Sequence, residues 1–215
     1  MLYICIVGTH QTGSTRLFNL VRLIYESKGL RIHSCWDYKG LYDNSNEYDV
    51  IVNKVHDTDY DNLSKYDIVL LPIRHLIDAA ISLNKRSKWP YLKSCMSNIN
   101  LYNKFENKCN FIFRYEDYSH NYIQDFSSKI LNIKLTTSTI NEIMDTLENM
   151  LKNKNIVKQG DYSCPEFSKT LLCRAHNTSN GASNKYKQLP TNVINELLKN
   201  KEITEFLKKT NYSCK

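Results

Sequence analysis

A lysine and a histidine, Lys54 and His56, stand two residues apart at the end of an apolar run. In an extended chain such residues share one side, so an ammonium and an imidazole would lie in the same site. An imidazole with an ordinary pKa of roughly 6.5 is largely neutral at neutral pH and can take the proton of a hydroxyl nucleophile. Lys54 would neutralise charge on a transferring group. The pair predicts group transfer to a hydroxyl, although a polar strand end facing water also explains it when taken alone.

The segment 8–15 has the outline of a phosphate-binding loop, because an apolar run leads into a glycine-bearing turn and then a helical pattern. Backbone N–H groups at the start of a helix attract anions, and Ser14 and Thr15 add hydroxyl donors. A nucleoside-triphosphatase loop needs a lysine directly after its second glycine, yet Ser14 follows Gly13 here. The loop predicts phosphate binding without ATP or GTP hydrolysis. A capped turn with no ligand is the alternative.

A third candidate is the pair Arg74 and Ser82. Arg74 stands at the end of another apolar run, and Ser82 follows two turns into a helical pattern that spans 76–85. Both side chains could reach one phosphate.

The elements that would position these residues follow from the apolar patterns. Apolar runs predict strands over 2–7, 30–35, 50–55, 66–73 and 110–115. Helical spacing predicts helices after Thr15, over 76–85, around 140–151, and over 191–200 and 202–209. The alternation predicts an α/β fold with a central parallel sheet flanked by helices, and a helical C-terminal third. The segment 158–188 has little periodicity and is predicted to be a loop region.

Composition narrows the class of protein. The 215 residues, 41% of them hydrophobic, are expected to form a single domain over 1–215. The formal charge of +7 is spread along the chain without a dense basic run, which favours a small polyanion over nucleic acid. The seven cysteines show no zinc-ligand spacing, so we expect reduced thiols and no metal site. No apolar stretch approaches the roughly 18 residues of a membrane span, and we expect a soluble cytoplasmic protein.

Taken in order, these segments resemble the sulfotransferases that use 3′-phosphoadenosine 5′-phosphosulfate (PAPS). In that family an arginine, seven intervening residues and a serine hold the 3′-phosphate, which is the spacing of Arg74 and Ser82. The strand that ends in Tyr115-Glu116-Asp117 is similar to the family's strand beside the adenosine. Ser179-Asn180-Gly181, before Lys185-Tyr186-Lys187, is similar to its late glycine loop over the 3′-phosphate.

The resemblance covers most of the chain, from Gly8 to about Leu189, and implies a P-loop NTPase-like sulfotransferase fold. It implies that Lys54 and His56 are catalytic. The implied cofactor-binding residues are Gln11, Thr12, Gly13, Ser14, Thr15, Arg74, Ser82, Tyr115, Ser179, Asn180 and Gly181.

Two positions depart from the family pattern. Gln11 stands where many members carry a lysine or arginine, and Ser179-Asn180 replace the usual Arg-Lys pair. Gln11 can still donate a hydrogen bond, and Lys54 or Lys185 can supply the missing cation.

The predicted reaction moves a sulfuryl group from PAPS to an acceptor hydroxyl without a metal and releases adenosine 3′,5′-bisphosphate (PAP). The acceptor is left open among a small molecule, a glycan and a tyrosine. Aromatic residues in 36–48 and 88–102 are candidates for its pocket, namely Trp36, Tyr38, Tyr42, Trp89 and Tyr91. The alternatives are a P-loop kinase-like enzyme and a noncatalytic nucleotide-binding protein on the same fold.

Overall fold

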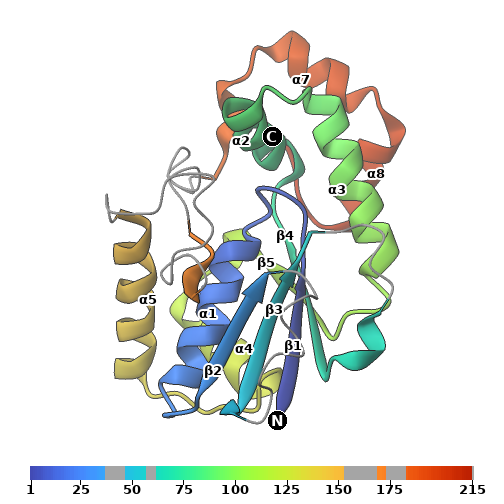
Figure 1. The fold of residues 1–215 in the computed structure, drawn as a ribbon. Helices are drawn as coiled ribbons and strands as arrows, with labels where there is room; N and C mark the ends of the chain where they lie inside the picture. The colour runs from blue at the N-terminus through green and yellow to red at the C-terminus, as the bar shows by residue number, and fades with distance from the viewer. Residues whose placement is uncertain (37–46, 57–61, 153–168, 173–182, 215) are drawn as a thin grey trace.

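A five-stranded parallel sheet in the order β2-β3-β1-β4-β5 forms the centre of the protein (Figure 1). The computed structural model describes residues 1–36, 47–56, 62–152, 169–172 and 183–214. The strands are β1 (Leu2–Val7), β2 (Ile32–Trp36), β3 (Val50–Val55), β4 (Ile68–Ile73) and β5 (Phe111–Arg114). Their β-branched and apolar residues form strands because helices cover both faces of the sheet, so that successive side chains are buried on opposite sides.

Two hydrophobic cores lie on the two faces of the sheet. Ile4 and Ile6 of β1 belong to one core, whereas Cys5 and Val7 belong to the other. The first core is closed by α1 (Ser14–Glu26), α4 (His120–Lys129) and α5 (Thr137–Lys152). The second is closed by α2 (Leu76–Ser87), α3 (Tyr91–Phe105), α7 (Thr191–Leu198) and α8 (Lys201–Lys209). Short 3-10 helices complete the described elements: η3 (Leu63–Lys65), η4 (Tyr115–Asp117) and η6 (Lys185–Gln188).

The predicted α/β architecture, with its parallel sheet between helices, is confirmed, and so is the helical character of the described C-terminal segments. The strands over 2–7 and 50–55 have the predicted bounds, while the strand predicted from Tyr66 begins at Ile68. Most of the predicted loop region 158–188 lies outside the described residues. None of the helices in the described ranges is both long and apolar enough for a membrane crossing.

The carboxyl ends of the strands meet at one edge of the sheet. Val7 of β1 pairs with Val55 of β3, and Ile73 of β4 pairs with Arg114 of β5. The phosphate loop, His56, Arg74 and Tyr115 therefore leave the sheet at the same edge. In an open parallel sheet this edge is where ligands bind.

Candidate functional site

The loop between β1 and α1 turns sharply at two residues with left-handed backbone. Gln11 has φ 68° and Gly13, the residue before the first helical turn, has φ 89°. A Cβ added to Gly13 would lie 2.4 Å from Cδ2 of Tyr115, so the loop backbone packs directly on the tyrosine ring. Thr12 fixes the turn, because its hydroxyl donates to the Thr9 carbonyl at 2.9 Å. The first N–H groups of α1, which have no acceptor within the helix, thus begin beside Tyr115.

Lys54 and His56 leave β3 next to this loop. The Lys54 ammonium is buried and donates to the Thr15 hydroxyl, and it lies 4.7 Å from the centre of the Trp36 ring. His56 Nδ1 contacts the carbonyl oxygen of Gly8. Since a carbonyl can only accept, Nδ1 carries the proton, and Nε2 is the nitrogen that can accept one.

Arg74 and Ser82 meet as their spacing predicts. Arg74 Nη1 lies 3.5 Å from Ser82 Oγ, and Lys185 Nζ donates to the same oxygen at 3.1 Å. Ser82 in turn donates to the carbonyl of Asp78 at 2.9 Å, which fixes its hydroxyl. Burial and the nearby Arg74 lower the pKa of Lys185 to about 8. Two cationic groups therefore converge on one hydroxyl, which we call the Ser82 cradle.

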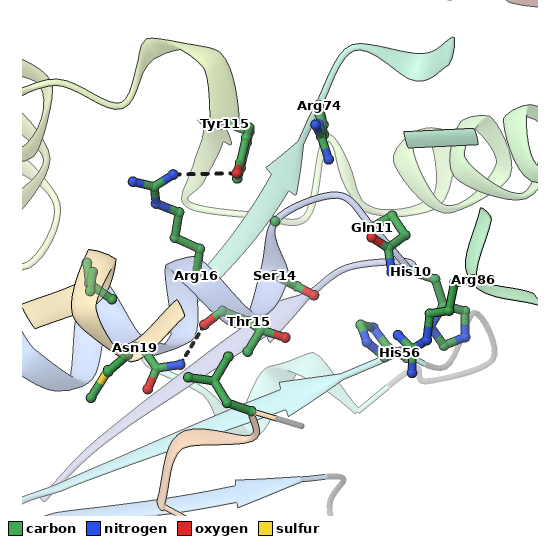
Figure 2. A pocket seen from close by; sticks show the side chains of 14 residues that line it. His10, Gln11, Ser14, Thr15, Arg16, Asn19, His56, Arg74, Arg86 and Tyr115 are labelled. Atoms are coloured by element: carbon green, nitrogen blue, oxygen red, sulfur yellow. Dashed lines mark hydrogen bonds between the residues drawn. The ribbon is translucent and has the colours of Figure 1, made fainter. Parts of the chain in front are cut away.

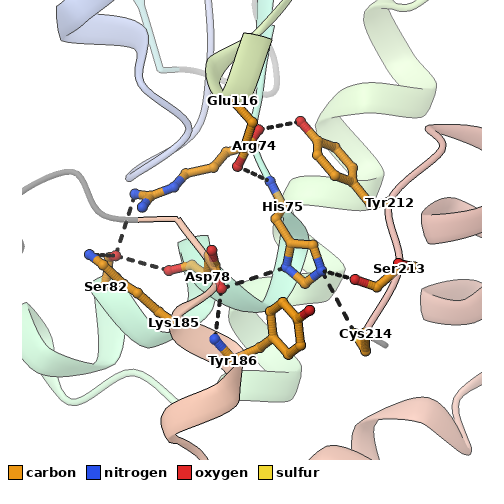
Figure 3. A network of polar contacts seen from close by, with 10 residues as sticks. All are labelled: Arg74, His75, Asp78, Ser82, Glu116, Lys185, Tyr186, Tyr212, Ser213 and Cys214. Carbon is orange, nitrogen blue, oxygen red and sulfur yellow. Dashed lines mark hydrogen bonds and ion pairs between the residues drawn. The ribbon is translucent and has the colours of Figure 1, made fainter. Parts of the chain in front are cut away.

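A polar network holds this cradle to the C-terminal tail (Figure 3). Asp78 Oδ1 accepts from the Tyr186 N–H at 2.8 Å, which places the neighbouring Lys185. Glu116 accepts from the N–H of His75 at 2.9 Å and from the Tyr212 hydroxyl at 2.5 Å. The turn that follows Arg74 is thereby attached both to the segment after β5 and to the chain's last described residues. Sequence patterns gave no sign of these contacts, because their partners are far apart in the chain.

One pocket opens at the carboxyl edge of the sheet, and Figure 2 shows its polar walls. The predicted site residues that line it are Gln11, Gly13, Ser14, Thr15, His56, Arg74 and Tyr115. Thr12, Lys54 and Ser82 are not among the lining residues. Lys54 and Ser82 contact lining residues, Thr15 and Arg74 respectively, whereas Thr12 bonds to Thr9 within the loop. The predicted Ser179, Asn180 and Gly181 lie outside the described residues, as do Tyr38 and Tyr42.

Several pocket residues were missed by the sequence analysis. They are the polar His10, Arg16, Asn19 and Arg86 and the apolar Leu147, Met150 and Leu172. Arg16 directly follows the loop, a position that could have singled it out. Its guanidinium lies 3.7 Å from the centre of the Tyr118 ring, and Nη1 donates to the Tyr115 hydroxyl at 3.4 Å. Arg86 gave no sequence signal, because only the packing of α2 brings it to the loop.

Comparison with solved structures identifies the fold that carries this site. No protein-family model matches the chain, and no curated protein matches it. Among solved structures, mouse sulfotransferase SULT7A1 in complex with PAP is similar, with a TM-score of 0.66 over 96% of this chain and 88% of that one, at 12% identity. This chain has the sulfotransferase fold. Retinol dehydratase in complex with retinol and PAP has a TM-score of 0.63 over 96% of this chain and 81% of that one, at 15% identity. A second retinol dehydratase structure contains androsterone and the inactive cofactor PAP.

In this sulfotransferase fold the pocket is strongly basic. Three arginines line it, namely Arg16, Arg74 and Arg86. No aspartate or glutamate is among the described residues that line it. Burial, together with the charges of Arg86 and Lys54, lowers the pKa of His10. Among the described residues, no three His, Cys, Asp or Glu side chains gather into a potential metal site. The arrangement suits a ligand with several negative charges.

Proposed function

We propose that the protein transfers a sulfuryl group from PAPS to a hydroxyl of an acceptor and releases PAP. The observation that carries the proposal is the Ser82 cradle, which stands beside the phosphate loop on the same edge of the sheet. The donor has two anionic ends, a 3′-phosphate and a 5′-phosphosulfate. The loop packs on the Tyr115 ring through Gly13, and the Arg74 guanidinium of the cradle lies 4.7 Å from the centre of the same ring. The cationic cradle and the anion-binding loop therefore correspond to those two ends.

The residues present fit this donor. Arg74 and Lys185 are like charges close enough for Arg74 to lower the pKa of Lys185, and a 3′-phosphate between them would relieve the repulsion. Tyr115 and Arg16 offer flat surfaces to the adenine base, beside the apolar Leu147 and Met150. The loop N–H groups and Lys54 would face the 5′-phosphosulfate. PAPS supplies a sulfuryl group that is already activated by its bond to phosphate.

His56 is proposed as the general base. Because Nδ1 donates to the Gly8 carbonyl, Nε2 would accept the acceptor's hydroxyl proton. The acceptor oxygen bonds to sulfur as the bond from sulfur to the phosphate oxygen breaks in line. Lys54 and the N–H groups of the loop stabilise the charge that develops on the sulfuryl and phosphate oxygens. Gln11 contributes a neutral donor where a cation is usual in the family, so more of this stabilisation falls to Lys54.

The experiment that tests the proposal compares His56→Ala with His33→Ala. The His33 ring contacts the Tyr48 ring, with 4.9 Å between their centres, and His33 does not line the pocket, so its variant controls for loss of an imidazole. Sulfuryl transfer from labelled PAPS is measured with a phenol, a tyrosine peptide and a glycan, alongside PAP binding by calorimetry. His56→Ala should keep its affinity for PAP and lose transfer by about a hundredfold or more. Transfer that survives in His56→Ala would remove the histidine from the chemistry, and PAP binding with no transfer by the unaltered protein would favour the noncatalytic alternative.

A further inference from the structure

Arg86 is a cationic pocket residue that the proposed binding of PAPS does not use. It lies in the last turn of α2, is half-buried and lines the pocket. Figure 2 shows its side chain beside the rings of His10 and His56. No hydrogen bond or ion pair joins its guanidinium to another residue in the described part of the chain, in contrast to the arginines nearby.

The other cations in or next to the pocket already have places in the proposed donor site. Arg74 belongs to the Ser82 cradle, Arg16 lies on Tyr118, and Lys54 is bonded to Thr15. Arg86 lies instead on the side of the proposed base. An acceptor must place its hydroxyl at His56. The rest of the bound acceptor would therefore lie next to Arg86.

The charges around Arg86 also favour an anion there. The described residues that line the pocket include no carboxylate that could neutralise it. Lys54 is a second cation near Arg86, because the charges of Lys54 and Arg86 both act on His10 and lower its pKa. A neutral acceptor would leave the half-buried guanidinium without a partner, whereas a carboxylate, sulfate or phosphate matches its planar fork of donors.

We propose that the acceptor carries an anionic group near the hydroxyl that receives the sulfuryl group, and that Arg86 binds this group. The proposal rests on the proposed function, since it assigns the substrate class of the same site. It separates this protein from one that sulfates neutral alcohols or phenols. The role of Arg86 is acceptor binding, so the affinity for PAP should not depend on it.

The test uses phenols that differ in one charge. Para-hydroxyphenylacetate is paired with its neutral amide, and hydroquinone monosulfate and monophosphate are paired with hydroquinone monomethyl ether. These arms distinguish carboxylate, sulfate and phosphate. kcat/KM is measured for each, and calorimetry with the PAP-saturated protein measures binding of the same pairs. Variants are Arg86→Gln, Arg86→Lys and, as a control of equal charge change, Lys88→Gln, whose side chain is exposed and outside the pocket lining.

At least one anionic phenol should exceed its neutral partner by about tenfold to a hundredfold, the range of hydrogen bonds to charged groups. Arg86→Gln should abolish this preference, Arg86→Lys should retain part of it, and Lys88→Gln should leave it unchanged. Equal use and equal binding of charged and neutral partners would overturn the anionic acceptor. A loss of PAP affinity in Arg86→Gln would overturn it too and assign Arg86 to the donor. Failure of the unaltered protein to bind PAP would instead refute the proposed function itself.

Discussion

Gly13→Ala tests whether the phosphate loop depends on direct packing against Tyr115. The added Cβ would lie 2.4 Å from Cδ2 of the tyrosine, whereas carbon atoms normally approach to about 3.5–4.0 Å. Loop or ring must therefore move by about 1 Å, and overpacking of this kind costs about 1–3 kcal/mol. The left-handed backbone of Gly13, with φ 89°, adds about 1–2 kcal/mol for a residue with a Cβ. Together the free energy of unfolding should fall by about 2–5 kcal/mol.

Gly29→Ala is the matched control. Gly29 also has a left-handed backbone, with φ 72°, but a Cβ there would meet nothing within 4 Å. Its variant should carry only the backbone cost, about 1–2 kcal/mol. The difference between the two variants therefore isolates the contact with Tyr115.

The assay is denaturant unfolding of both variants, with PAP titration at a denaturant concentration where each is folded. Gly13→Ala should also weaken PAP binding, because Tyr115 contacts both Arg16 and Arg74. Gly29→Ala should bind PAP normally. Equal destabilisation by the two substitutions, with unchanged PAP binding in Gly13→Ala, would refute the argument.

Three further predictions concern the Ser82 cradle and its support. Since the pKa of Lys185 is lowered to about 8, PAP binding should be accompanied by proton uptake just above pH 8, and the affinity for PAP should fall as the pH rises further. Calorimetry in buffers of different ionisation enthalpy measures this proton uptake. Lys185→Met should abolish it. Ser82→Ala removes the hydroxyl shared by Arg74 and Lys185. The affinity for PAP, measured by calorimetry, should fall about tenfold. An unchanged affinity would exclude a binding role for Ser82. Tyr212→Phe removes the donor to Glu116 and should lower the free energy of unfolding by about 1–3 kcal/mol in urea, and no change would show that this bond does not hold the tail.

The sheet could be predicted because its strands carry strong local signals. β1 and the first half of β3 are runs of apolar, largely β-branched residues that are mostly buried, so the bounds of both strands needed no tertiary information. The helices α3 and α4 were missed, because their buried faces are weak or mixed. In α3 the buried face includes Ser94 and Asn98, and Asn98 accepts from the Thr9 hydroxyl.

The candidate site was predicted only where residues keep a fixed spacing along the chain. Arg74 and Ser82 are linked by one turn and one helix, so their sequence spacing decides their distance. Asp78 and Arg86 lie on the same helix as Ser82, but the groups that they face, the Tyr186 N–H and His10, belong to segments remote in sequence, which no local pattern records. The role predicted for Ser179, Asn180 and Gly181 stays a prediction, because they lie outside the described residues.

The most direct test of the proposed donor site is calorimetric binding of PAP without added metal, with ATP as competitor. The unaltered protein is compared with Arg74→Ala and with Arg31→Ala, whose guanidinium pairs with Asp49 outside the pocket. The protein should prefer PAP to ATP, Arg74→Ala should lose at least about tenfold in affinity, and Arg31→Ala should bind as the unaltered protein does. No binding of PAP, or a preference for ATP with Mg²⁺, would contradict the sulfotransferase proposal and favour a kinase-like enzyme.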